Sequence, residues 1–174
     1  DWKRPINFST GGIYDPENIF YLSNYLQYDG FSYRLVPIYT EEREDGELGR
    51  VDGNSLYNIV KNYKWGNFKD LSTHFDETCT QNIVSYRSSA SRAAEALALS
   101  GQKAKAIEVL DLASREIPVA KYDDPRSLSS IVYGYIVSGQ EQKGLQLAEK
   151  LKKGIFTEYD YYSSLSPDEQ INKI

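Results

Sequence analysis

Few side chains in this sequence are suited to catalysis or to binding a metal. His74 is the only histidine and Cys79 the only cysteine, and they stand five residues apart. A zinc site needs about four such ligands or carboxylates at close, paired spacing, which the sequence lacks. A nucleophilic Cys–His pair stays open only as an arrangement that the fold would have to assemble. We therefore predict no metal ion and no cofactor.

Motifs for phosphate, sugar-nucleotide and glycoside chemistry are also missing. The glycines at 46 and 49 are followed by no Lys-Ser or Lys-Thr pair, so no phosphate-binding loop is predicted. The nearest approach to a metal-binding Asp-x-Asp motif is Glu158-Tyr159-Asp160. Among 25 acidic residues some carboxylate pair can always be found, so such a pair carries no weight for glycoside hydrolysis. We expect no residue of this chain to be catalytic.

The charge and hydropathy of the chain narrow the classes of partner. Its 174 residues suffice for one domain with a substantial core and carry a formal net charge of −5. Residues 1–80 hold 8 basic and 13 acidic side chains, and a surface of that kind repels nucleic acid and anionic lipid. The apolar run 131–136 is far too short to span a bilayer, and the first residues predict no signal peptide. Methionine is missing throughout, so we expect a fragment or processed product of a longer protein.

The elements that must position any functional side chain are organised around a repeated unit. Ser100-Gly101-Gln102 returns as Ser138-Gly139-Gln140, an offset of 38 residues. Apolar residues at three- and four-residue steps flank each copy, which predicts two helical hairpins. The residues that predict the helix boundaries are Gly101, Pro118, Asp124-Pro125, Gly139 and Gly154.

The repeat also resembles the tetratricopeptide (TPR) pattern. The matching positions are Ala90, Ala93-Ala94, Leu97, Ala106, Leu110 and Pro118 in the first unit, and Leu128, Ile131-Val132, Tyr135, Gly144, Ala148 and Phe156 in the second. The small residue and the proline of the first unit fit, whereas its aromatic positions are aliphatic. Two ordinary helical hairpins are the alternative. Because about three repeats are usually needed to bury such a core, we predict that the N-terminal half covers one helical face.

Residues 1–80 are predicted to be an α/β part of the domain. Alternating apolar and polar residues predict short strands at about 5–9 and 31–40, with Pro37 at the edge or end of the second. A helix is predicted from Asp15-Pro16 to Asp29-Gly30. Further predicted features are a carboxylate partner for Arg34, a solvated acidic loop over 41–53, a helix capped by Asp52 and an aromatic turn over 64–68.

The predicted fold class is therefore α+β and mostly helical. A small strand-containing N-terminal part packs on a TPR-like pair of α-hairpins, which occupies residues 81–155. Residues 156–174 are predicted to be a tyrosine-rich C-terminal extension, irregular as far as Leu165, with a short helix beginning at Ser166-Pro167.

In a TPR arrangement the first helix of each hairpin lines a concave face. The predicted binding surface consists of Ser88, Ser91, Glu95, Arg126, Ser129 and Tyr133. Its hydroxyls, single acid, guanidinium and aromatic ring would suit an extended peptide or a glycan, in which the ring stacks and the others bind polar groups. The alternative is that the N-terminal half buries this face.

Several segments together resemble a known family. They are Arg4-Pro5-Ile6, Tyr25-Leu26-Gln27, the run 29–38 and Lys64-Trp65-Gly66-Asn67, with Arg4, Pro5, Tyr33, Arg34, Leu35, Val36, Pro37, Trp65 and Gly66 as the family-like structural residues. With the TPR-like hairpins, they resemble the C-terminal soluble region of the DUF2723 membrane proteins. That family is abundant in Bacteroidetes and similar to the polytopic protein O-mannosyltransferases of the GT-C class. The resemblance covers most of residues 2–155.

This resemblance implies a role and no reaction. In such proteins the transferase chemistry lies in a multi-spanning N-terminal region, so no catalytic residue carries over to this chain. The expected function is that of a non-catalytic accessory domain on the periplasmic side of the inner membrane. It would position a protein or glycoprotein acceptor, or other parts of its parent chain, the parent being a lipid-linked-sugar-dependent glycosyltransferase.

Two other functions stay open at this stage. One is a stand-alone TPR-type protein-binding scaffold, and the other is a glycoside hydrolase with carboxylates near the tyrosine-rich tail. Nucleic acid is not an expected partner, and a membrane is expected only through a transmembrane region outside this chain.

Overall fold

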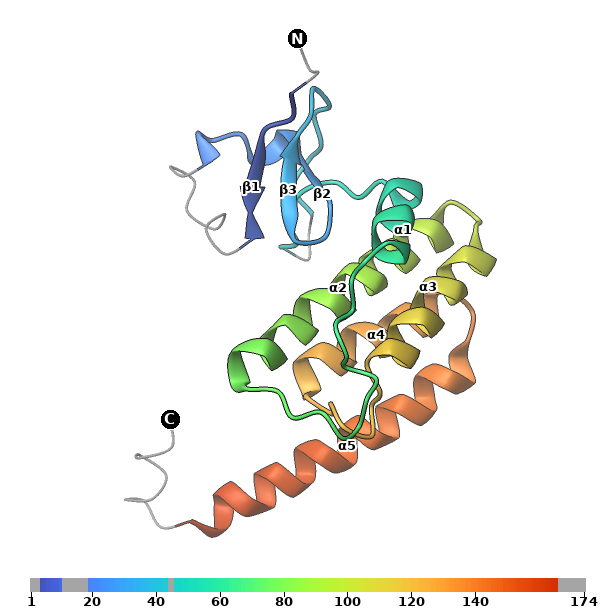
Figure 1. Ribbon diagram of the computed structural model, residues 1–174. Coiled ribbons are helices and arrows are strands. Elements are labelled where there is room, and N and C mark those ends of the chain that lie inside the picture. The colour runs from blue at the N-terminus through green and yellow to red at the C-terminus, as the bar shows by residue number, and fades with distance from the viewer. Residues whose placement is uncertain (1–3, 11–18, 44–45, 166–174) are drawn as a thin grey trace.

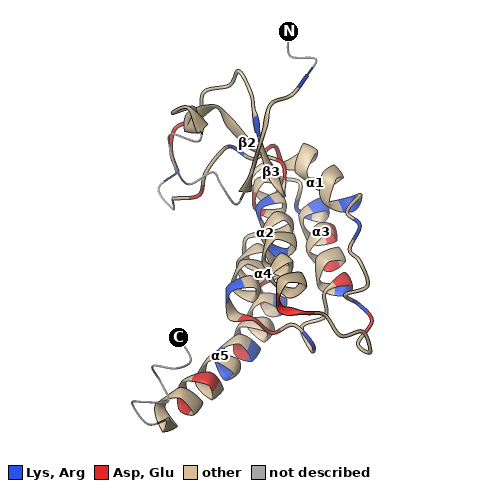
Figure 2. Cartoon of the chain, turned by 60° about the vertical axis from the view of Figure 1, so that its left-hand side comes forward, with Lys and Arg blue, Asp and Glu red and all other residues tan. Residues whose placement is uncertain are grey.

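The computed structural model describes residues 4–10, 19–43 and 46–165. Three short strands come first, β1 (Asn7–Ser9), β2 (Leu26–Tyr28) and β3 (Ser32–Leu35), with a 3₁₀ turn, η3 (Ser23–Tyr25), before β2. The α-helices of the described part are α1 (Gly53–Lys61), α2 (Glu77–Leu99), α3 (Lys103–Glu116), α4 (Pro125–Val137) and α5 (Glu141–Ser164). The sheet lies along one side of α2, and α5 extends beyond the other helices (Figure 1, Figure 2).

β3 is the central strand of a three-stranded antiparallel sheet with the order β1-β3-β2. Tyr33 of β3 faces Phe8 across one ladder and Tyr28 across the other. The rings of Tyr28 and Tyr33 are buried, with centroids 5.2 Å apart. Tyr28 also reaches α2, since its hydroxyl lies 3.0 Å from Ser89 Oγ. One face of the sheet is therefore part of the core.

The helix predicted over 15–30 is wrong in its described part. Residues 26–28 form β2, and all three are buried. Arg50 pairs with the open side of this strand: its N–H donates to Leu26 O and its carbonyl accepts from Tyr28 N–H, both at 2.9 Å. This pairing with a distant residue outweighs the helical spacing of the local apolar side chains. The predicted helix start at Asp15-Pro16 lies outside the described residues.

The second predicted strand is shorter than the expected 31–40. β3 stops at Leu35, and the described residues between it and α1 form a loop. Val36 N–H still donates to Tyr25 O at 2.8 Å, but Pro37 has no N–H with which to continue a ladder. Arg34 has its predicted carboxylate partner, because its Nε lies 2.9 Å from Asp29 Oδ2.

The helix caps agree with the predicted chemistry. Asp52 accepts a hydrogen bond from Ser55 N–H at 2.9 Å, and Asp124 accepts one from Ser127 N–H at the same distance. α2 begins at a cap of the same kind, Asp76, which accepts from Cys79 N–H at 2.7 Å. Each side chain satisfies a backbone donor that a helix leaves unpaired in its first turn.

The two hairpins turn with the same geometry at the predicted offset. Gly101 and Gly139 have φ angles of 78° and 84° and follow α2 and α4. After each glycine, the next residue donates its N–H to a carbonyl in the last turn of the preceding helix at 2.8 Å, which is the Schellman arrangement. Only glycine adopts this φ without strain. The helical hairpins are confirmed, and their assignment to the TPR family stays a prediction.

α5 is longer than predicted. It passes through Gly154 and continues to Ser164, so residues 156–164 are helical and not irregular as predicted. A glycine inside a helix costs about 1 kcal/mol relative to alanine but does not by itself end the helix. At the position equivalent to Pro118 this unit has Phe156, which can continue a helix. The short helix predicted at Ser166-Pro167 lies outside the described residues.

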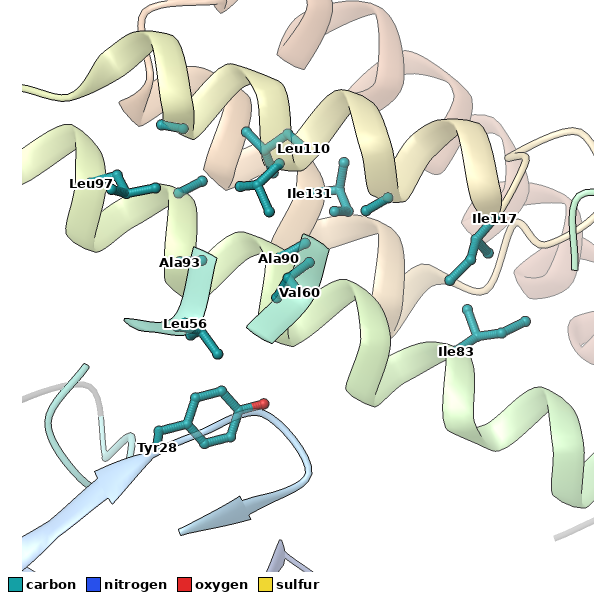
Figure 3. Packing of buried hydrophobic residues seen from close by; sticks show 14 of the residues in the cluster. Tyr28, Leu56, Val60, Ile83, Ala90, Ala93, Leu97, Leu110, Ile117 and Ile131 are labelled. Carbon is teal, nitrogen blue, oxygen red and sulfur yellow. The ribbon is translucent and has the colours of Figure 1, made fainter. Parts of the chain in front are cut away.

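α2 is the centre of the helical part: it packs on α1, α3 and α4, while α4 packs on α5. Figure 3 shows Leu56 and Val60 of α1 on one side of α2, with Leu110 and Ile131 on the other. Small residues permit this close packing. Ala90, Ala93 and Ala94 of α2 are fully buried, and a Cβ on Gly144 would lie 2.7 Å from Ile136 Cγ1. The predicted α+β, mostly helical class is confirmed, with the sheet and α1 covering α2.

Candidate functional site

The six residues predicted as a binding surface lie on two neighbouring helices. Ser88, Ser91 and Glu95 belong to α2, and Arg126, Ser129 and Tyr133 to α4. We call these six residues the α2/α4 face. The structure brings two of them into contact, since the Tyr133 hydroxyl donates to Glu95 Oε1 at 3.5 Å. The α2/α4 face is thus continuous across the two helices where Glu95 meets Tyr133.

Ser91 does not belong to the accessible part of the α2/α4 face. Its side chain is buried and donates to the carbonyl of Ser130 on α4. A Cβ on Gly134 would lie 3.2 Å from Ser91 Oγ, so the two helices meet closely here. The predicted role of Ser91 in ligand binding is therefore corrected to a packing role between α2 and α4.

Glu95 is held by the N-terminal part of the chain. Arg43, in the loop after β3, places its guanidinium 3.1 Å from Glu95 Oε1, and the glutamate side chain is only 16% exposed. The loop between β3 and α1 therefore covers the Glu95 end of the α2/α4 face. This agrees with the alternative prediction, in which the N-terminal half buries the face, for that end only. A ligand that used Glu95 would have to compete with Arg43.

The three residues of the face on α4 are open, whereas Ser88 on α2 is half-buried. Tyr133 is 50% exposed, and the Arg126 side chain is 81% exposed with its Nε 3.4 Å from Asp124 Oδ1. Ser129 lies between them on the same side of α4 and donates to Arg126 O at 2.9 Å. Because they are seven residues apart, the ring and the guanidinium are separated by roughly 10 Å along the helix. Such a pair can stack on a flat group at one end of a ligand and bind an anionic or carbonyl group at the other.

Arg92 is a buried structural residue that sequence reasoning missed. It lies on α2 and is buried, with its guanidinium 4.0 Å from the centroid of the Tyr28 ring. It donates to the carbonyls of Leu48 at 2.8 Å and Gly49 at 3.2 Å, and it forms an ion pair with Glu47 at 3.2 Å. A buried guanidinium needs such partners to offset its desolvation. Arg92 therefore joins the N-terminal sheet and loop to the helices.

Arg87, five residues earlier on α2, was also missed. It donates to Ser127 Oγ at 2.8 Å and to the carbonyls of Ile117 and Tyr122 at 3.1 and 2.8 Å. Burial lowers the pKa of the Arg87 guanidinium to about 10, while the charges of Asp124 and Asp123 oppose the shift. The residue stays charged at neutral pH and holds the connection between α3 and α4 against α2.

A weak signal for both arginines exists in the sequence. They interrupt the small and apolar residues of α2, so each must lie on or beside the helix's buried sides. The pattern does not say whether such an arginine is buried or extends to solvent, because its long aliphatic stem permits either. The partner carbonyls of Arg87 and Arg92 lie 30 or more residues away from them, and only the fold brings them near.

The family-like structural residues form no single site. Arg4 and Pro5 precede β1 and are exposed, and Tyr33 is buried in the sheet. Trp65 is buried and stacks on Tyr86 with ring centroids 5.1 Å apart. Gly66, with φ of 64°, makes the predicted aromatic turn possible. Tyr33 and Trp65 support the packing of the N-terminal part, whereas the exposed members of the set do not.

Neither a metal centre nor a spanning helix is found within the described ranges. No group of three or more His, Cys, Asp or Glu side chains there could hold a metal ion. No helix of that part is both long and apolar enough to cross a membrane.

One comparison with known proteins gives a match, and it covers the first third of the chain. No curated protein and no solved structure matches the chain. Residues 1–55 match the family model of TMEM260-associated domain 2, and this segment contains all three strands of the sheet and the loop that binds Arg92. The N-terminal part of this chain is therefore similar to a membrane-protein-associated domain.

Proposed function

We propose that this chain is a non-catalytic accessory domain of a glycosyltransferase-like membrane protein and lies on its extracytoplasmic, periplasmic side. The observation that carries the proposal is the match of residues 1–55 to a membrane-protein-associated domain. The resemblance to the DUF2723 membrane proteins supports the finer assignment. The domain's task is to position a protein or glycoprotein acceptor, or another part of the parent chain.

The contacts of Arg92 and Arg43 support a positioning role. Arg92 joins the family-matched segment to α2, and Arg43 reaches from the same segment to Glu95 on the α2/α4 face. A parent membrane protein attached to the N-terminal part would therefore hold the face in one orientation. The exposed ring of Tyr133 and guanidinium of Arg126 provide contacts suited to an extended peptide or a glycan.

The test uses the full-length parent protein in its own cells. We expect Tyr133→Ala combined with Arg126→Ala to weaken acceptor binding by about 1–3 kcal/mol, because a large contact side chain is lost. Glycosylation of the extracytoplasmic proteins should fall accordingly, while the abundance of the parent and the melting temperature of this domain should not change.

Matched controls are Tyr39→Ala and Arg115→Ala, which remove an exposed ring and an exposed guanidinium away from the α2/α4 face. Equal glycosylation in the double variant and the controls would contradict the positioning role. A parent sequence without membrane-spanning segments would contradict the membrane-protein assignment and would favour a stand-alone scaffold.

A further inference from the structure

Two adjoining hollows lie where the connection between α3 and α4 meets α2 and α5. The first, of about 370 Å³, lies against the first turns of α2, and the second, of about 460 Å³, lies against α5. They share three lining residues, which are Asp123, Pro125 and Glu158. We call the two hollows together the connection groove. It is separate from the α2/α4 face, except that Arg126 borders the first hollow.

Negative charge gathers in the first hollow. Of its carboxylates, that of Asp124 is already used, because it caps α4 and pairs with Arg126 at 3.4 Å. The ammonium of Lys121 is used as well, since it donates to two backbone carbonyls of the turn before α2. The carboxylates that form no ion pair within the described part of the chain are Glu77, Asp123 and Glu158.

These three carboxylates come from three different elements, so the fold, and not a local acidic run, places them around one hollow. As a group they could not hold a metal ion. An ammonium or guanidinium group is then the cation that suits them, because it can donate hydrogen bonds to several carboxylates.

The second hollow has the opposite charge at its far end. Lys150 and Lys153 line it, and neither forms an ion pair with another described residue. Along α5 the acidic side chains follow these lysines (Figure 2). Lys150 and Lys153 precede Glu158 by eight and five residues, so the two ends of the groove are separated by roughly 8–12 Å along the helix. The walls also include the half-buried, apolar Val119 and Pro125.

Gly154 of α5 lines the second hollow, and the fold does not require a glycine there. Its φ is not positive, and nothing lies within 4 Å of an added Cβ. Gly144 of the same helix differs, because a Cβ there would lie 2.7 Å from Ile136 Cγ1. A glycine inside a helix costs about 1 kcal/mol relative to alanine. The missing side chain of Gly154 leaves room for the backbone of a ligand to approach.

We propose that the connection groove binds an extended peptide segment of a partner protein, with a lysine or arginine at the acidic end and a carboxylate at the lysine end. Charges of both signs at a fixed separation fit a chain that carries both. An extended chain advances about 3.3 Å per residue, so its two charges are roughly two to four residues apart. The binding is weak and falls with salt, because exposed charge pairs each contribute little.

The first test measures peptide binding to the full chain by fluorescence anisotropy. The probe is a labelled, end-blocked peptide of sequence Lys-Thr-Val-Thr-Glu, and the matched control peptide is Gln-Thr-Val-Thr-Gln. We expect the charged peptide to bind about fivefold more tightly or better, and the difference to shrink at high salt. A charged peptide that does not bind at millimolar concentration, or that binds no better than its control, overturns the proposal.

The second test changes the groove. Asp123→Asn combined with Glu158→Gln should weaken binding of the charged peptide about fivefold or more. The matched control is Glu141→Gln combined with Asp160→Asn, which removes the same charge from two residues of α5 outside both hollows. Both double variants should keep the wild-type helix content by circular dichroism. Equal losses of affinity in the two would overturn the proposal, since only net charge would then matter.

The third test fills the groove. Gly154→Leu should abolish most of the binding, whereas Ser163→Leu, which adds the same side chain to an exposed position outside both hollows, should not. A lipid surface is the competing occupant of the lysine end. Sedimentation with phosphatidylglycerol-containing vesicles that depends on Lys150 and Lys153, in a chain that does not bind the peptide, would identify lipid and overturn the proposal. No substitution here alters Tyr133 or Arg126, so failure would leave the proposed acceptor-positioning role untouched.

Discussion

The two hairpins share their turn geometry and differ in how far their second helices are buried. Ile117, at the end of α3, is fully buried, whereas Ile155, its equivalent 38 residues later in α5, is 45% exposed. α3 packs against α1, α2 and α4, but α5 has its main contact with α4 alone. A repeated sequence unit therefore specifies a hairpin, and the neighbours of that hairpin specify which of its residues form the core.

The hairpins also differ in where their second helices end. Pro118 lacks the N–H needed to continue α3, and the chain turns there toward α4. Phe156 occupies the equivalent position in α5, and the helix runs on to Ser164. Residues 155–164 can therefore continue α5, because this unit has no proline at the position equivalent to Pro118. Four predictions test this comparison.

The largest effect is expected from truncating the two equivalent isoleucines. Ile117→Ala should lower the free energy of unfolding by about 2–5 kcal/mol, because it leaves a cavity in a fully buried site. Ile155→Ala should cost less than about 0.5 kcal/mol at protein concentrations where the chain is monomeric. Denaturant unfolding of both variants measures the difference. Similar costs would show that the end of α5 is as tightly packed as that of α3.

Phe156→Pro should give α5 the ending that α3 has. The proline removes a backbone donor and clashes with the carbonyl one turn earlier, so the helical signal of residues 155–164 at 222 nm should be lost. The free energy of unfolding should fall by less than about 1 kcal/mol, since residues 155–164 bury little apolar surface. Phe156→Ala is the control that keeps the helix. A large loss of stability in Phe156→Pro would mean that residues 155–164 support the core.

The two capping glycines should respond alike. Gly101→Ala and Gly139→Ala should each cost about 1–2 kcal/mol, because a Cβ strains the left-handed backbone. A Cβ at Gly101 meets nothing within 4 Å and one at Gly139 comes no closer than 3.7 Å to Lys103 Nζ, so strain and not collision is the cause.

Gly154→Ala is the control for these glycines, because its φ is not positive and nothing lies within 4 Å of the added Cβ. It should be neutral or stabilise the chain by up to about 1 kcal/mol. Thermal melts of the three variants measure these changes in stability. A loss of stability in only one of Gly101→Ala and Gly139→Ala would disprove the equivalence of the two turns.

The smallest effect concerns a turn that covers the first hairpin only. Asp70 accepts hydrogen bonds from Ser72 Oγ at 2.7 Å and Ser72 N–H at 2.9 Å, which lower the pKa of its carboxyl from 3.8 to about 2. The carbonyls of Asp70 and Thr73 in turn accept from Lys121, after α3. Because the folded pKa lies below the unfolded one, the stabilisation is complete above about pH 4 and is lost as the pH falls toward 2.

Carboxyl titration by NMR should therefore give Asp70 an unusually low pKa. The Asp70→Asn variant should lose this part of the acid dependence of stability. A carboxyl that titrates near its ordinary value would show that the turn is not held by these hydrogen bonds and does not secure the first hairpin in the expected way.

The predicted binding surface was only partly accessible for a reason that no single stretch of sequence contains. Ser88, Ser91 and Glu95 were assigned from the TPR-like alignment, which depends on spacing along the helix and places them on one side of α2. Spacing says nothing about which other element lies against that side. The contacts of Ser91 with Ser130 and of Glu95 with Arg43 join residues about 40 and 50 positions apart, so they appear only once the chain is folded.

The sequence by itself determined the local features of this protein. The caps at Asp52 and Asp124 and the turns at Gly101 and Gly139 depend on atoms within a few residues of one another, and they could be predicted. Only the tertiary structure decided that residues 26–28 are a strand and that Arg87 and Arg92 are buried. Those outcomes depend on partners distant in sequence, whose burial and hydrogen bonding outweigh local preference.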